Sequence, residues 1–279
     1  MKTILVPTDF SPNANKALNY AAEIAITSRA NIIILHVTDL THASMNETII
    51  LPASIDKEVI HEANRQLNVL ATVTREITGG EVDYKLYNGF VPDAIQVAAK
   101  ENNADLIVMG TLGDAGIREK LFGSMTAKVI SQSTIPVLAV PLMYEWTPPK
   151  NILLAINNFK DSYKVLEPLT WLAGLLKATV HMSMFIDDAD SVNLIQNKKD
   201  MKQFCEIIKI ENPGIDIYPE TIYGQNFEDA IKLHIAENKS DILVMVTHKR
   251  NFLVSIFNRS MTKKMSYHTD IPLLSIPVH

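Results

Sequence analysis

The 279-residue sequence predicts an α/β protein made of two tandem Rossmann-like domains, each a five-stranded parallel sheet flanked by helices. Three observations support this prediction. Short apolar runs alternate with longer segments of helical periodicity, which is typical of parallel strands joined by crossover helices. The two halves of the chain repeat each other along most of their length. A hydrophobic content of 47% and a charged content of 20% are those of a globular protein with a full core.

The first half opens with an apolar strand over residues 4–7 and a helix over residues 11–28. Ser11 and Pro12 suit the N-cap and the first helical position of that helix. Residues 31–37 contain the run Ile-Ile-Ile-Leu, which is typical of a strand buried on both faces of a parallel sheet. The later elements are predicted as helix 55–77, strand 82–87, helix 92–101, strand 106–109, helix 125–133 and strand 137–140.

An internal repeat divides the chain in two. Residues 111–141 align without a gap with residues 247–277, an offset of 136, and residues 2–5 align with 150–153, an offset of 148. The first copy therefore holds about twelve extra residues, which we place in 41–54. The linker 144–149 contains two prolines that continue neither a helix nor a central strand.

The repeat predicts domains over residues 1–143 and 150–279. The strands expected in the second copy are 152–156, 179–185, 215–218, 242–246 and 273–276.

Charge and cysteine content exclude several classes of protein. Residues 1–143 hold 11 Lys and Arg against 15 Asp and Glu, and the rest of the chain holds 15 against 16, so no basic nucleic-acid-binding half exists. Cys205 is the only cysteine and is expected to be buried on a helix, with a reactive thiol as the alternative. Without a signal peptide or a run of about 18 apolar residues, a cytoplasmic protein with no membrane partner is expected.

Three glycines frame the loop that follows the fourth strand. Gly110 is expected to turn the chain at a backbone angle that side chains resist. Gly113 would let a sugar–phosphate approach the backbone. Gly123 opens a helix whose first N–H groups and dipole favour a phosphate. Ser124 and Thr126 place hydroxyl groups on the same turn.

Other motifs are missing from the sequence. It contains no G-x-x-x-x-G-K-[ST] loop and no H-x-x-x-H pair, and no catalytic or protein-derived metal site is predicted. Arg118 and Lys120 lie in the glycine loop, where they either contact a phosphate or remain solvated.

Several segments together resemble the ATP-binding branch of the universal stress protein family. They are the opening Ile4-Leu-Val-Pro-Thr-Asp-Phe-Ser, the strand end Leu35-His36-Val37, Gly89 before a helix, residues 105–109, and the spacing Gly-x-x-Gly-x9-Gly-Ser. The resemblance covers essentially the whole chain as two copies. It implies an adenine nucleotide alpha hydrolase-like fold with sheet order 3-2-1-4-5 in each copy.

The resemblance also implies how ATP would be held. Asp9 would meet the ribose hydroxyls with Thr8 beside it, and the backbone of Val37 would bind the adenine edge. Pro7 and Met109 end the strands at this site, where Mg²⁺ or Mn²⁺ would bridge phosphate oxygens. The phosphates would be held by Gly110, Leu112, Gly113, Gly123, Ser124, Met125 and Thr126. As alternatives, Asp9 serves as a helix-capping partner and His36 as a packed or capped residue.

The second copy has lost this pattern. The three glycines and Asp9 are replaced by Val246, Lys249, Arg259 and Asn157, respectively. Long or β-branched side chains then stand where bare backbone is needed. We interpret the second domain as one that keeps the fold without a competent nucleotide site. A different anion site at Lys249 and Arg259 is the alternative.

The last strands of the two copies are apolar edges, which invite aggregation when unpaired. The family resemblance implies that strands 137–140 and 273–276 pair antiparallel within the chain, and a homodimer is a further hypothesis. For function, the first hypothesis is a stress-response regulatory module that binds ATP and hydrolyses it at most slowly. The others are an ATPase or phosphoryl or nucleotidyl transferase with real turnover, and a nucleotide-independent interaction protein.

Overall fold

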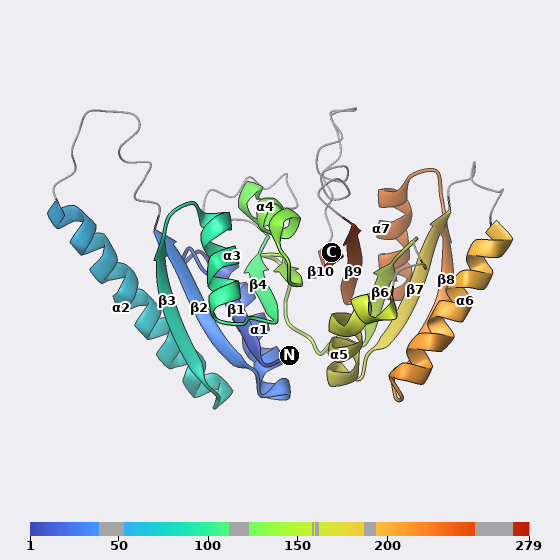
Figure 1. Cartoon of the computed structure of the whole chain (residues 1–279), viewed down its shortest axis with the longest axis horizontal. Helices are drawn as coiled ribbons and strands as arrows, with labels where there is room; N and C mark the ends of the chain where they lie inside the picture. Colours follow the sequence, from blue (N-terminus) through green and yellow to red (C-terminus); the bar gives the residue numbers. More distant parts are fainter. Residues whose placement is uncertain are drawn as a thin grey trace.

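The computed structural model describes residues 1–38, 53–111, 123–157, 159, 162–186, 194–248 and 270–278. Its strands form one continuous ten-stranded sheet of order β3-β2-β1-β4-β5-β10-β9-β6-β7-β8, with helices on both faces (Figure 1). Each half contributes five neighbouring parallel strands, so the predicted fold class and the order 3-2-1-4-5 are confirmed in both copies.

The elements of the first half are β1 (Thr3–Pro7), α1 (Pro12–Ser28), β2 (Asn31–Thr38), α2 (Ala53–Thr78), β3 (Val82–Asn88), α3 (Val91–Glu101), β4 (Leu106–Gly110), α4 (Ser124–Gln132) and β5 (Val137–Val140). Those of the second half are β6 (Asn151–Ala155), the 3₁₀ helix η2 (Tyr163–Leu166), α5 (Glu167–Leu176), β7 (Thr179–Ile186), α6 (Leu194–Glu211), β8 (Ile217–Tyr223), α7 (Phe227–Asn238), β9 (Ile242–His248) and β10 (Leu273–Val278).

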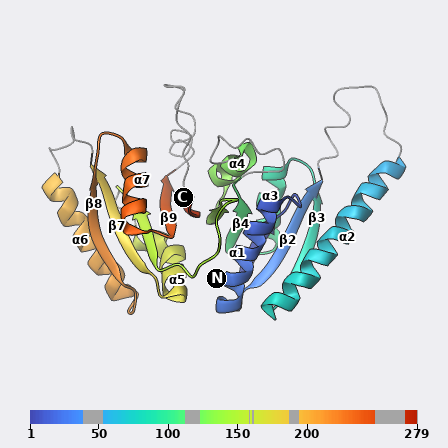
Figure 2. The ribbon, with the colours of Figure 1, turned by 180° about the vertical axis from the view of Figure 1, so that it is seen from behind.

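Two apolar cores cover the two faces of the sheet. Helices α1, α2, α5 and α6 pack on one face, and α3, α4 and α7 pack on the other (Figures 1 and 2). Each core includes residues from both halves, such as Ile4 and Ile152 on the first face and Val137 and Leu273 on the second. The two domains therefore fold onto a shared hydrophobic interior, and burial of this apolar area is the main stabilising contribution.

The junction between the halves is the antiparallel pair β5–β10, as predicted. Leu138 lies opposite Leu274, which is its own counterpart in the repeat, and Ala139 lies opposite Leu273. The pair is therefore self-complementary, like the twofold interface of a homodimer. Each apolar edge strand is buried by the other.

One predicted strand was wrong. The sequence indicated a strand over residues 215–218, whereas β8 begins at Ile217 and runs through Pro219 to Tyr223. Strand β8 lies at the edge of the sheet and pairs only with β7. An edge strand tolerates proline, because the missing N–H need not serve a neighbouring strand.

Two smaller predictions concern single residues. Cys205 is fully buried on α6, its thiol donates to the carbonyl of Ile217 at 3.6 Å, and burial raises the pKa of that thiol to about 11. The structural interpretation of this cysteine is confirmed. Residues 41–52 of the predicted insertion lie outside the described residues. Among the helices that are described, none is both long and apolar enough to cross a membrane.

Candidate functional site

Strand β1 lies between β2 and β4, and the chain leaves β1 and β4 toward opposite faces of the sheet. Helix α1 packs on one face and α4 on the other. The connections therefore diverge at the carboxyl ends of β1 and β4, which is where ligands bind in doubly wound sheets. The predicted residues at the strand ends, Pro7, Met109 and Gly110, are brought together at this edge.

A tight turn after β1 orients Thr8 and Asp9. The hydroxyl oxygen of Thr8 accepts from Phe10 N at 3.0 Å, and Phe10 has a φ of 64°. Thr8 is buried, whereas Asp9 is exposed and its Oδ1 accepts from Ser11 N at 3.1 Å. Ser11 in turn caps α1 by accepting from Ala14 N at 3.2 Å. The N-cap role thus belongs to Ser11, and Asp9 stabilises the turn while presenting its carboxylate to solvent.

His36 supports the same turn from β2. Its Nδ1 lies 2.8 Å from the carbonyl oxygen of Thr8, and its ring lies 4.5 Å from that of Phe10. A carbonyl oxygen can only accept, so Nδ1 carries the hydrogen. His36 is therefore a packed and hydrogen-bonded histidine that positions the Thr8–Asp9 turn.

The backbone of Val37 points toward the predicted site. Thr8 N donates to Leu35 O at 2.8 Å, so the carbonyl of Leu35 faces β1. In a parallel strand the residue two positions on faces the same side. Strand β1 ends at Pro7, and the N–H and C=O of Val37 therefore point into the space beyond its carboxyl end.

Gly110 is required for close packing. A Cβ built there would lie 2.6 Å from Cγ of Asn13 and 3.0 Å from the Asn13 carbonyl oxygen. The predicted reason, an unusual backbone angle, was wrong: among the described glycines, positive φ occurs at Gly79, Gly89 and Gly214, and Gly110 ends strand β4. The side chain of Asn13 thus fills the space that a Cβ at position 110 would need.

Asn13 was missed by sequence reasoning. It is 3% exposed in the first turn of α1, and its Nδ2 donates to Val140 O at 3.4 Å, which joins α1 to the end of β5. A buried amide in the first turn of the helix after β1 was the available signal. The sequence does not show that this amide lies beside Gly110, so its role in packing could not be predicted.

Helix α4 is attached to the end of β4 by two hydrogen bonds. Gly123, its N-cap, donates through its N–H to Thr111 O at 2.6 Å. The buried Thr126 hydroxyl donates to Gly110 O at 2.8 Å. The first-turn N–H groups of residues 124–126 are those that a helix cannot satisfy internally. Thr126 therefore positions the helix start, whose first-turn N–H groups are of the kind that can bind an anion.

The remaining residues of the predicted site differ in their exposure. Met109 is 7% exposed and packs in the core, whereas Met125 is 40% exposed at the start of α4. Leu112, Gly113 and the side chain of Ser124 lie outside the described residues, as do Arg118 and Lys120.

In the second half, a side chain of the protein pairs with the backbone groups that correspond to those of Val37. The counterpart of Val37 is Phe185, whose N–H donates to Asn157 Oδ1 at 3.1 Å and whose carbonyl accepts from Asn157 Nδ2 at 3.3 Å. The side-chain amide of Asn157 therefore pairs with both backbone groups. Val246, the counterpart of Gly110, is buried at 6% exposure. Lys249 and Arg259 lie outside the described residues.

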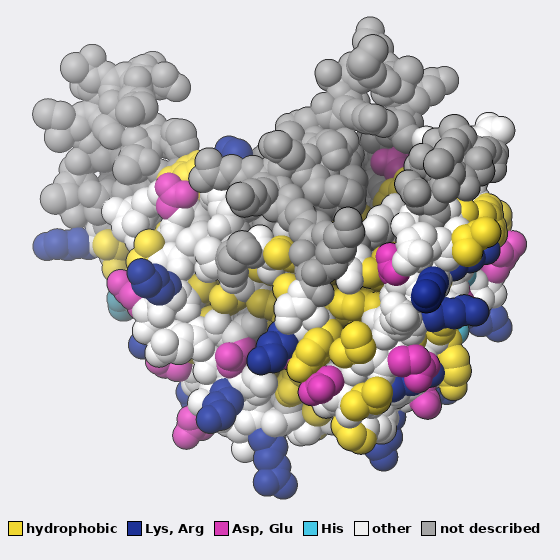
Figure 3. Space-filling view, turned by 45° about the vertical axis from the view of Figure 1, so that its right-hand side comes forward, with side chains coloured by type: hydrophobic (Ala, Val, Ile, Leu, Met, Phe, Trp, Pro, Cys, Tyr) yellow, Lys and Arg dark blue, Asp and Glu magenta, His cyan; other side chains and the backbone are white. Residues whose placement is uncertain are grey.

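Charge at the surface is mixed. On the face drawn in Figure 3, Lys and Arg side chains alternate with Asp and Glu and do not gather. Within the described ranges, no group of three or more His, Cys, Asp or Glu side chains is arranged to hold a metal ion.

Comparison with known proteins identifies the family. The model of the universal stress protein family matches residues 1–141 and again residues 148–277. Universal stress protein Slr1230 of Synechocystis sp. is 25% identical over 295 residues, which cover 99% of both chains. Universal stress protein MJ0577 of Methanocaldococcus jannaschii is 30% identical over 152 residues, covering 50% of this chain and 94% of that protein.

A solved universal stress protein from Archaeoglobus fulgidus has the same fold, with a TM-score of 0.77, 21% identity, and coverage of 99% of this chain and 98% of that one. The family match to both halves agrees with the two five-stranded sheets of the structure. The chain therefore belongs to the universal stress protein family and carries two copies of the family domain in tandem.

Proposed function

We propose that this protein binds ATP in its N-terminal domain as a regulatory stress-response module, with at most slow hydrolysis. One observation carries the proposal: the two copies differ at the same backbone position. In the first copy the polar groups of Val37 face the space beyond β1. In the second copy the corresponding groups of Phe185 are paired with Asn157. An adenine edge, which offers one donor and one acceptor, suits only the first copy.

Residues of the first copy can be assigned in turn to the adenine, the ribose and the phosphates of ATP. The N–H and C=O of Val37 would bind adenine, and the exposed carboxylate of Asp9 would accept from the ribose hydroxyls. The start of α4, including Gly123 and Met125, would bind phosphate through backbone N–H groups. Leu112, Gly113 and Ser124 belong to the same proposal.

A divalent cation, Mg²⁺ or Mn²⁺, would enter with the nucleotide and be held by its phosphate oxygens. The protein contributes the turn at Thr8 and the close approach of Gly110 to Asn13, which position these groups before binding. The second domain would serve as the structural partner of the first, through the β5–β10 pair.

The direct test is mass spectrometry of nucleotide released from the freshly purified, denatured protein. We expect ATP, together with a rise in the thermal midpoint on adding Mg-ATP, because a ligand at 100 times its Kd adds about 2.7 kcal/mol of stability. ADP or AMP in place of ATP would favour an enzyme with real turnover. No nucleotide and no thermal shift would instead favour an interaction protein that needs none.

Substitutions at Asp9 test the adenine assignment. Asp9→Ala should weaken ATP binding by about tenfold, through loss of one or two ribose hydrogen bonds. Asp9→Asn should weaken it further, because its amide can pair with Val37 as Asn157 pairs with Phe185. Isothermal titration with Mg-ATP measures both effects.

Asn157→Asp is the matched control and should leave the affinity unchanged. If Asp9→Asn bound ATP as tightly as the unmodified chain, neither Asp9 nor the Val37 backbone would lie in the site.

A further inference from the structure

The pair β5–β10 gives the molecule a local twofold relationship. Leu138 lies opposite its own counterpart, Leu274, so the strands and helices on one side of the pair have counterparts on the other. Two grooves between the domains are counterparts of this kind. One of them is open and the other is filled by the chain itself.

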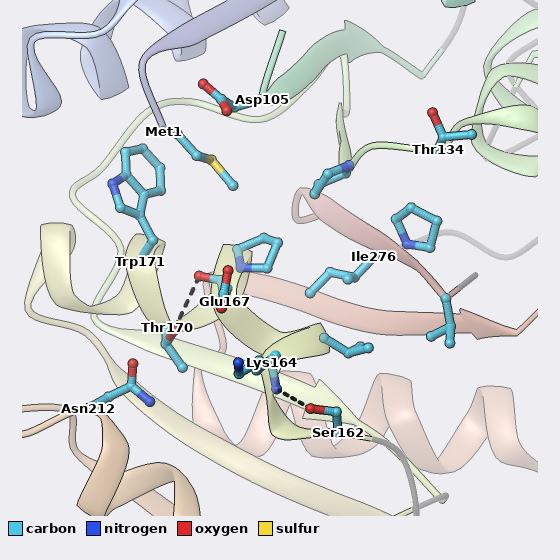
Figure 4. A pocket seen from close by; sticks show the side chains of 15 residues that line it. Met1, Asp105, Thr134, Ser162, Lys164, Glu167, Thr170, Trp171, Asn212 and Ile276 are labelled. Carbon is cyan, nitrogen blue, oxygen red and sulfur yellow. Dashed lines mark hydrogen bonds between the residues drawn. The ribbon is translucent and has the colours of Figure 1, made fainter. Parts of the chain in front are cut away.

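The open one is a cavity of about 810 Å³ between the two domains, here named the interdomain groove. Met1, Asp105 and Thr134 line it from the first domain, and Lys164, Trp171 and Ile276 from the second. Figure 4 shows side chains of both domains around this space. It lies at the amino ends of β1 and β4, the opposite edge of the sheet from the proposed nucleotide site.

The counterpart groove holds the linker between the domains. The ring of Tyr20 on α1 lies 4.6 Å from Trp146, edge to face, and 5.8 Å from Tyr144. Between these two aromatic residues, Glu145 pairs with Lys16 of α1 at 2.5 Å. The linker therefore fills this groove with an aromatic–acidic–aromatic sequence.

Asp241 marks the correspondence between the grooves. It accepts hydrogen bonds at the start of β6, from Asn151 N at 2.9 Å, just as Asp105 accepts from Thr3 N at 3.0 Å at the start of β1. Burial raises the pKa of Tyr20 well above its ordinary value, and the charges of Tyr144 and Asp241 add to this rise. Asp241 therefore lies beside the filled groove, as Asp105 lies in the open one.

One of the side chains that hold the linker, Lys16, has a counterpart of the same type in the open groove, whereas Pro168 stands at the repeat position of Tyr20. Lys164 stands at the repeat position of Lys16, and its side chain is exposed. In the open groove, the end of β10, including Ile276, takes the position that the end of β5 has in the filled groove. Trp171 on α5, half-buried, supplies an aromatic surface one turn from the position of Tyr20. The open groove is thus lined by a cation from η2 and by an aromatic ring from α5, seven residues further along the chain.

We propose that the interdomain groove binds an extended segment of a partner protein in which an acidic residue is flanked by aromatic residues. The acidic residue pairs with Lys164, and an aromatic side chain packs on Trp171. Aromatic and charge-paired anchors of this kind supply most of the energy of small interfaces. Asp105 and Glu167 also line the groove. The filled counterpart has Asp241 at the repeat position of Asp105 and still accepts Glu145, whereas the counterpart of Glu167 is Asn19.

The test uses a fluorescent peptide with the sequence of residues 141–149 and measures its anisotropy with the full chain. We expect saturable binding that Lys164→Glu weakens by about tenfold or more, and Trp171→Ala likewise. Lys202→Glu, an exposed change on α6, is the matched control and should have no effect. Lys164 is exposed, so its variant should keep the thermal midpoint of the unmodified protein.

A charge swap makes the test specific. A peptide with Glu145→Lys should bind the Lys164→Glu variant better than it binds the unmodified chain. Loss of binding in Lys16→Glu rather than in Lys164→Glu would mean that the peptide displaces the linker, and the proposal would be wrong. Absence of saturable binding up to about 1 mM, an interaction energy near 4 kcal/mol, would also overturn it.

Discussion

A Gly123→Arg variant is expected to lose ATP binding by at least about 100-fold while keeping its fold. Gly123 has a φ of −59° and a ψ of 156°, a backbone conformation that any residue adopts without strain. Its N–H bond to Thr111 O does not involve a side chain. The substitution therefore leaves the start of α4 intact and places a long side chain over the N–H groups proposed to bind phosphate. It also copies Arg259 of the second domain.

Gly123→Ala is the matched control, since it adds one methyl group at the same backbone position. We expect it to lose much less affinity than Gly123→Arg in isothermal titration with Mg-ATP, at equal thermal midpoints without nucleotide. Retained affinity in Gly123→Arg would show that the phosphates do not bind at the start of α4. A folded Gly123→Arg variant that still co-purifies with ATP would lead to the same conclusion.

Gly110→Ala is expected to destabilise the protein by about 2–3 kcal/mol. The added Cβ meets Asn13 at distances that overlap its side chain and crowd its backbone carbonyl. Overpacking of a core costs about 1–3 kcal/mol, and displacing Asn13 also weakens its bond to Val140 O, worth about 1 kcal/mol. Chemical denaturation monitored by circular dichroism measures the loss.

A double-mutant cycle tests the cause. Asn13→Ala removes the atoms that a Cβ at position 110 would overlap first, so the double variant should cost at least about 1 kcal/mol less than the sum of the single ones. Gly174→Ala is the control, because a Cβ there meets nothing within 4 Å. Gly174 lies in the last turn of α5, so its replacement should stabilise by at most about 0.5–1 kcal/mol. Additive costs at positions 13 and 110 would refute the packing explanation.

The second domain shows how the same packing changes when the glycine is lost. Val246 stands at the counterpart of Gly110, and α5 has 10 residues where α1 has 17. The 3₁₀ helix η2 precedes α5. A side chain at position 246 occupies space that the first turn of α1 uses in the first domain. We infer that loss of the glycine and the later start of the α-helix are linked.

Local patterns carried most of the fold prediction. Apolar runs of strand length, the Ser11 cap and the repeat offsets identified the elements and their order, because each depends on neighbouring residues or on direct comparison of the two halves. The errors occurred where the position of a strand in the sheet mattered. The strand predicted over residues 215–218 stopped before Pro219, whereas the sheet order shows that Pro219 belongs to an edge strand.

The sequence alone therefore determined the family, the two-domain order, the pairing of the last strands and the positions that differ between the copies. Only the tertiary structure decided that Gly110 is needed for Asn13, that Asn157 pairs with Phe185, and that the linker fills one groove and leaves its counterpart open. These contacts join residues far apart in the chain, such as Lys16 and Glu145, 129 positions apart. Such contacts arise from how the elements pack, which no local pattern of residues encodes.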